Sequence, residues 1–166
     1  MFSEDGQLFE GAKGDLELSA QVIHAPIHRI TGAKVVMHTH QHWALTLNML
    51  EDNKLIPANQ TSAIYFDNQV AYDDDYTGAA TTLSEGERLC SALGDKHTLF
   101  MKNHGVLVVG STVAEAYHRL YLLERVCGVQ VLAMAANKTI VPIPKETIDK
   151  SKYTAGNDPH SPTLRT

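Results

Sequence analysis

Apolar residues recur along the chain at two spacings, one typical of helices and one typical of strands. Residues 15–31 carry apolar side chains close to a helical repeat, which predicts a helix that is kinked at Pro26 or begins near it. Residues 112–136 show the same repeat over a longer stretch, and 43–50 are helical in composition. The pattern therefore predicts at least three helices, with the longest near the C-terminal end.

Two sequence signals mark helix starts. Thr82 is followed by Glu85, and Thr112 by Glu115, which is the spacing of a capping box. The first signal predicts a short helix that runs to Leu93 and is closed by the glycine that follows, and the second opens the long helix.

Strands are indicated by short runs rich in β-branched and aromatic residues. These runs cover 33–37, 63–72 (with a bend at Asp67-Asn68), 98–101 and 106–109. Strands and helices alternate irregularly, which favours a mixed α/β fold in which helices cover a sheet.

Length and composition limit the classes to consider. The chain has 166 residues with a net charge of −5 and no cluster of basic residues, so we expect neither nucleic acid nor a membrane as a partner. The N-terminal residues lack the apolar region of a secretory signal, and no run reaches membrane-spanning length, which predicts a cytoplasmic protein. Cys90 and Cys127 are expected to be buried, reduced thiols.

One domain accounts for this organisation. We expect an irregular lead-in over 1–14, the domain over 15–144, and a polar C-terminal tail over 145–166, after Pro142 and Pro144 stop regular structure.

The chemistry that stands out is a set of three histidines. His38 and His40 flank Thr39 at the end of one strand-like run, so their side chains point to the same side. His104 lies at a turn between two other runs. Three imidazoles with an open fourth position are typical of a catalytic zinc site, although iron, copper or nickel also bind imidazole.

The other polar residues give weaker signals. His24 and His28 are spaced like the ligands of zinc proteases but lack the intervening glutamate, and His42 is better explained as a neighbour of the site or a surface residue. Asp73 opens an acidic loop that could supply a general acid or base, or could simply be a solvated turn.

These residues give the chain a resemblance to a known family. The stretches His38-Thr39-His40 and Lys102–Gly110, followed by Ala114-Glu115-Ala116 and Leu123-Glu124, resemble the class II aldolase/adducin family, over about residues 16–136. The resemblance implies a three-layer αβα fold with a mostly antiparallel central sheet. It also implies zinc held by His38, His40 and His104.

The function that the resemblance implies is that of a lyase. Family enzymes cleave or epimerise sugar phosphates through a metal-stabilised enediolate, and they form homotetramers with sites at subunit boundaries. We therefore expect a zinc-binding protein that acts on a small sugar-derived or carbonyl substrate.

The chain departs from the family pattern in two ways. The aldolases carry an acidic base four positions before a histidine of the helix, and counting back from His24 that position here is Ala20. Glu17 and Asp73 are the candidates to replace it. The sequence also begins after most of the family's phosphate-binding segment, with Ser19 remaining near the second phosphate loop. We therefore expect metal binding with weak or absent cleavage of sugar phosphates. The alternative is an adducin-like, cytoskeleton-associated interaction module that keeps the fold and the metal site.

Overall fold

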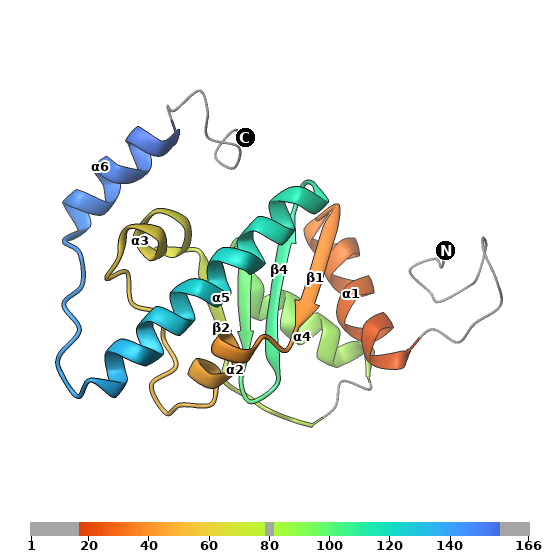
Figure 1. The fold of residues 1–166 in the computed structure, drawn as a ribbon. Coiled ribbons are helices and arrows are strands. Elements are labelled where there is room, and N and C mark those ends of the chain that lie inside the picture. Colours follow the sequence, from red (N-terminus) through yellow and green to blue (C-terminus); the bar gives the residue numbers. More distant parts are fainter. Residues whose placement is uncertain (1–16, 79–81, 157–166) are drawn as a thin grey trace.

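A four-stranded mixed sheet organises the molecule (Figure 1). The computed structural model describes residues 17–78 and 82–156; the expected lead-in over 1–14 lies outside them. The strands are β1 (Val35–Thr39), β2 (Val70–Asp73), β3 (Thr98–Met101) and β4 (Gly105–Gly110). They lie in the order β1-β4-β3-β2, in which β2 and β3 are parallel and the other two pairs are antiparallel.

Helices cover both faces of this sheet. They are α1 (Leu18–Thr31), α2 (His42–Asn48), α3 (Gln60–Phe66), α4 (Leu83–Leu93), α5 (Val113–Ala135) and α6 (Lys145–Gly156). One apolar core joins the sheet to α1 and α4, and the other joins it to α2, α3 and α5. Alternation along β4 produces the two cores, since Leu107 belongs to the first and Val106 and Val108 to the second. The predicted three-layer αβα fold with a mostly antiparallel sheet is confirmed.

Pro26 lies inside α1, and the helix continues through it. A proline has no N–H to donate to the carbonyl four residues earlier, here that of Val22. Gly86 of α4 packs against this point, because a Cβ on Gly86 would lie 2.2 Å from the Val22 oxygen and 2.6 Å from Pro26 Cγ. The proline and the glycine therefore let α1 and α4 approach closely.

One predicted strand is wrong in its first half. Residues 63–66 belong to α3, and only Val70–Asp73 form a strand. The helix begins at Asn59, whose side chain accepts a hydrogen bond from the Ser62 N–H while the Ser62 hydroxyl accepts one from the Asn59 N–H. This reciprocal cap, together with burial of Ala63 and Phe66 on one side of the helix, overrides the β propensity of the segment.

Two details at helix ends also differ from expectation. Thr82 precedes α4 as predicted but makes no capping hydrogen bond with its side chain. The segment after Pro144 is not irregular throughout, because Lys145–Gly156 form α6. Ile148 of this helix is buried, and Lys152 donates to the Asp67 carboxylate at 2.7 Å, so these contacts hold α6 beside the domain.

The antiparallel pairing decides where the predicted metal ligands lie. His38 pairs with Leu107 and Thr39 with Val106, so the end of β1 lies beside the start of β4. The turn between β3 and β4 carries His104 at that same end of the sheet. Within the described residues, no helix is both long and apolar enough to cross a membrane.

Candidate metal centre

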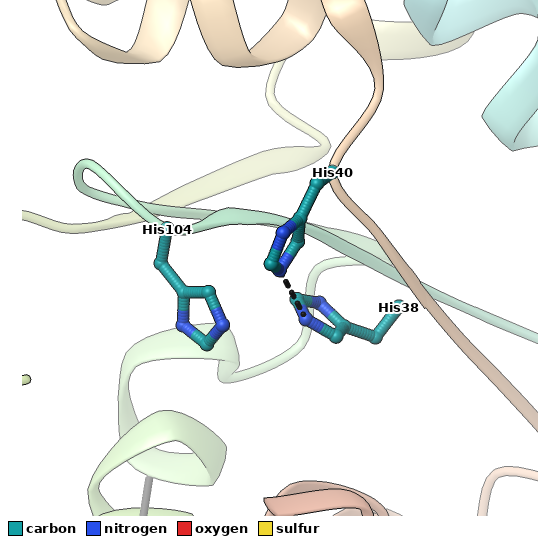
Figure 2. A group of neighbouring side chains, drawn as sticks. All are labelled: His38, His40 and His104. Carbon is teal, nitrogen blue, oxygen red and sulfur yellow. Dashed lines mark hydrogen bonds between the residues drawn. The ribbon is translucent and has the colours of Figure 1, made fainter. Parts of the chain in front are cut away.

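Three imidazoles converge at this end of the sheet, as Figure 2 shows. The ring centroids of His38, His40 and His104 are 4.9–5.0 Å apart in every pair. The Nε2 atoms of His38 and His40 are 3.2 Å apart, and one nitrogen from each of the three rings lies within 4.8 Å of the others. A tetrahedral zinc ion with bonds of 2.0–2.1 Å would hold two nitrogens about 3.3 Å apart, so the His38 and His40 nitrogens already have the separation that such an ion requires.

The state of His38 suits a metal ligand. Its Nδ1 donates a hydrogen bond to the Val106 carbonyl at 3.0 Å, which leaves the lone pair on Nε2 facing the other two rings. Burial, with a further contribution from His104, lowers the pKa of His38 to about 4, and burial and His40 lower the pKa of His104. Both rings are therefore neutral at pH 7, as metal binding requires.

Backbone geometry explains the residues around His104. Asn103 has a φ of 56°, a left-handed conformation that asparagine tolerates better than most residues. Gly105 is required for space, because a Cβ there would lie 2.6 Å from the Thr39 oxygen and 2.7 Å from His40 Cδ2. The glycine thus allows the strand that carries the histidine pair to approach the turn that carries the third ligand.

Two polar residues to which the sequence analysis gave no role hold this arrangement, the buried Asn48 and the half-buried Glu124. Asn48, at the end of α2, donates from Nδ2 to the carbonyls of Met101 and Gly105 at 2.5 and 3.2 Å, on both sides of the turn. Glu124 of α5 accepts hydrogen bonds from the N–H groups of Trp43 and Ala44, at the start of α2. Leu123-Glu124 belongs to the family resemblance, but Asn48 carries no local sequence signal.

Three acidic residues lie near the imidazoles. Glu17 caps α1, and a hydrogen bond from Ser19, with the nearby His38, lowers the pKa of its exposed carboxyl. Asp73, the other sequence candidate, is buried and paired with Arg88. Glu85, which the sequence analysis named only as part of a helix-start signal, interacts electrostatically with His104 and accepts a hydrogen bond from Thr77.

The remaining histidines named in the sequence analysis stay outside the cluster. His42 is exposed at the start of α2 with its ring against Trp43, and His28 contacts the Ala33 carbonyl through Nδ1. His24 lines a hollow of about 530 Å³ beside His38, together with aromatic and apolar side chains of β1 and α5. Thr39 Oγ1 and Gln41 Oε1 also belong to residues of this wall, and both atoms are buried without a hydrogen-bond partner in the part of the chain that the structure describes.

The fold and the histidine cluster are of the class II aldolase type, and comparison with known proteins supplies the family. Residues 2–131 match the class II aldolase and adducin N-terminal domain. The chain belongs to this family.

Similar proteins include both aldolase-type proteins and a decarboxylase. An aldolase II superfamily protein from Pseudomonas syringae has 36% identity and a TM-score of 0.83, covering 96% of this chain and 64% of its own. An L-fuculose 1-phosphate aldolase from Glaciozyma antarctica has 25% identity and a TM-score of 0.79, covering 93% of this chain and 59% of its own. Decarboxylase NovR from Streptomyces niveus is 32% identical over 81% of this chain and 50% of its own length.

The chain spans about half the length of the curated relatives that it matches. The match therefore concerns the domain that carries the histidines.

Proposed function

We propose that the protein is a zinc-dependent lyase that acts on a small carbonyl or sugar-derived compound. The observation that carries this proposal is the convergence of three imidazoles from the end of β1 and the β3–β4 turn. Among the described residues no fourth histidine, cysteine or carboxylate joins the cluster, so a substrate oxygen has a coordination position available.

The bound cation would supply positive charge to an oxygen of the substrate. Aldol cleavage and decarboxylation next to a carbonyl both need such charge, because each leaves an electron pair on the carbon beside the oxygen-bearing carbon. Membership of a family with both aldolase and decarboxylase relatives agrees with either reaction. Zinc is favoured because the set contains three imidazoles and no thiolate or ligating carboxylate.

Glu17 is the proposed proton-transfer residue. Only one of its carboxylate oxygens, Oε2, serves in the cap of α1, and His38 contributes to the lowered pKa of the group. The Asp73 carboxylate is committed to Arg88, and Glu85 is held by Thr77 and Arg88. Since Ala20 occupies the position of the family base, Glu17 is the available acid on the same helix.

Elemental analysis of the purified protein tests the metal site. We expect one zinc per chain in the parent, and loss of stoichiometric zinc in His38→Ala and His40→Ala. His42→Ala is the matched control, since His42 is exposed and lies outside the cluster. Equal zinc in the His38→Ala, His40→Ala double variant and the parent would overturn the assignment.

Activity is tested separately with the zinc-loaded protein. The assay follows release of a carbonyl product from fuculose-, rhamnulose- and ribulose-phosphates, and from the same sugars and β-keto acids without phosphate. We expect turnover on unphosphorylated compounds and little on the sugar phosphates. Full metal occupancy without any turnover would favour the adducin-like interaction module instead.

We also propose that the protein is a homo-oligomer, with a tetramer as the expected state. Large apolar side chains are exposed along one side of α5 at intervals of three to eight residues, namely Val113, Tyr117, Tyr121, Val129 and Leu132. Such a stripe is typical of a contact surface. Light scattering that gives a monomer mass at micromolar concentration would contradict this proposal.

A further inference from the structure

A second hollow, of about 770 Å³, lies at the opposite end of the sheet from the histidine cluster, and we call it the distal hollow. Its wall includes the start of β1, the end of β4 and the segment before β3, whereas the metal centre lies at the end of β1 and the start of β4. The six residues of β4 separate the two by about 17 Å. Its volume is within the range of small-molecule sites.

The charges of its wall are unlike those of the whole chain. The lining residues include the cationic Lys34, Lys96, Arg119 and Lys152, against the acidic Asp95 and Glu115. This is an excess of two positive charges in a protein whose net charge is −5. The distal hollow therefore favours an anionic ligand.

Not all of these cations are available to a ligand. Arg119 is paired with Glu115 at 2.6 Å, and Lys152 with Asp67 at 2.7 Å. Among the residues that the structure describes, Lys96 pairs only with the neighbouring Asp95, whose side chain is 87% exposed, and an exposed pair of this kind is weak. Within residues 17–78 and 82–156, the Lys34 ammonium has no hydrogen-bond or ion-pair partner.

Sheet geometry sets the distance between the two available ammonium groups. Lys34 precedes β1 and Lys96 precedes β3, and both strands are direct neighbours of β4. Two strand spacings put their backbones about 10 Å apart, so flexible lysine side chains can contact one carboxylate from two sides or two carboxylates of one ligand.

The rest of the wall is suited to an organic group. Ile64, Tyr65, Leu93 and Val109 provide apolar surface, and the edge of the Tyr65 ring meets the His118 imidazole. The Nε2 atom of His118 is buried and has no hydrogen-bond partner among the described residues. A ligand with an apolar ring and an acidic group would match this combination better than an inorganic anion.

We propose that the distal hollow binds a small organic carboxylate, with its anionic end between Lys34 and Lys96 and its apolar part against Tyr65 and Leu93. The ligand class follows from the two lysines and the apolar wall together. This site does not depend on the proposed lyase activity.

Binding is tested on the full chain by titration with isophthalate and benzoate, followed by backbone amide NMR. Benzamide, the neutral analogue, and inorganic phosphate serve as comparison ligands. We expect both carboxylates to shift amide signals of residues 31–34, 94–97 and 109–111, and benzamide and phosphate to bind at least tenfold more weakly. We expect the Lys34→Gln, Lys96→Gln double variant to weaken benzoate binding at least tenfold, and Lys138→Gln, a control on another surface, to leave it unchanged.

Zinc content and the amide spectrum in the absence of ligand show whether the double variant is folded, and each single variant is expected to weaken binding at least threefold. The proposal is overturned if benzamide binds as tightly as benzoate, if the folded double variant binds like the parent, or if the shifted signals lie at the histidine cluster. Phosphate binding as tight as that of benzoate would equally overturn the assignment of an organic ligand.

Discussion

Replacement of Asn48 tests whether a buried amide holds the third metal ligand in place. Asn48 is fully buried, and its Nδ2 donates to the carbonyls of Met101 and Gly105, while its Oδ1 accepts from Asn53 at 3.3 Å. The substitution Asn48→Ala leaves two buried carbonyl groups without this donor. The Met101 carbonyl still accepts a hydrogen bond from the His104 N–H, so at about 1–3 kcal/mol for a buried group that loses its donor we expect the free energy of unfolding to fall by about 1–3 kcal/mol.

The same substitution should weaken metal binding. The two carbonyls lie on either side of the turn that carries His104, so loss of the amide frees the turn to move away from His38 and His40. Groups that orient a ligand from outside the coordination sphere typically contribute 10–100-fold to metal affinity, and we expect a loss in this range. Urea unfolding measures the first effect, and competition with a zinc chelator measures the second.

Asn53→Ala is the matched control for this prediction. Asn53 is buried and donates to Asn48 and Asp74, and among the described residues it makes no side-chain hydrogen bond to the turn, so its removal should lower stability and leave zinc affinity within about twofold. Equal loss of zinc affinity in Asn48→Ala and Asn53→Ala would show that general destabilisation is responsible. Unchanged stability and affinity in Asn48→Ala would refute the reasoning entirely.

Three further changes test other parts of the structure. Gly105→Ala should lower bound zinc to below half an equivalent by elemental analysis, because the new Cβ would overlap Thr39 and His40; full occupancy would show that β1 and β4 can separate freely. Burial lowers the pKa of His97 in the folded protein to about 4, whereas the same side chain in the unfolded chain has a pKa of about 6.5. Below about pH 6.5 the unfolded chain therefore binds a proton that the folded protein does not, and the free energy of unfolding should fall by about 2 kcal/mol between pH 7 and pH 5. Urea titrations at both pH values should show a smaller fall in His97→Gln, and an unchanged slope would contradict this assignment. Glu17→Gln should lower kcat at least 100-fold with zinc still bound, whereas Asp73→Asn should mainly lower stability. A product-release assay in which Asp73→Asn loses activity and Glu17→Gln keeps it would identify Asp73 as the proton-transfer residue.

The sequence is sufficient to predict the parts of the fold that repeat with a regular period. The long helix α5, the strands β3 and β4, and the closure of α4 by Gly94 follow from apolar spacing and helix-end signals, and the structure confirms them. A strand is predicted for the residues of α3 because their aromatic and β-branched side chains favour a strand in isolation. Its helix depends on the Asn59 cap and on burial of Phe66 against other elements, which local propensity does not contain.

The histidine cluster was predictable for a different reason. An alternating strand fixes the relative direction of His38 and His40, and the turn sequence around His104 has a recognisable asparagine and glycine. The residues that fix the cluster could not be found in this way. Asn48 and Glu85 act across distances of 19 to 57 residues in the sequence, and nothing near either residue indicates its partner.

The effect of the histidine cluster on the stability of the metal-free protein distinguishes a metalloprotein from a domain that merely retains three histidines. Without a cation, His38 Nε2 faces two other imidazoles and Nδ1 has one hydrogen bond, so the cluster adds little to the stability of the fold. Residues kept for binding are often neutral or costly for stability in the absence of ligand. We therefore expect metal-free His104→Gln to be at least as stable as the metal-free parent, as measured by Tm. Added zinc should raise the Tm of the parent alone, because a ligand that binds only the folded state stabilises it. A His104→Gln variant that is several degrees less stable without metal would instead show that the histidines serve the fold, which is the result expected of an interaction module.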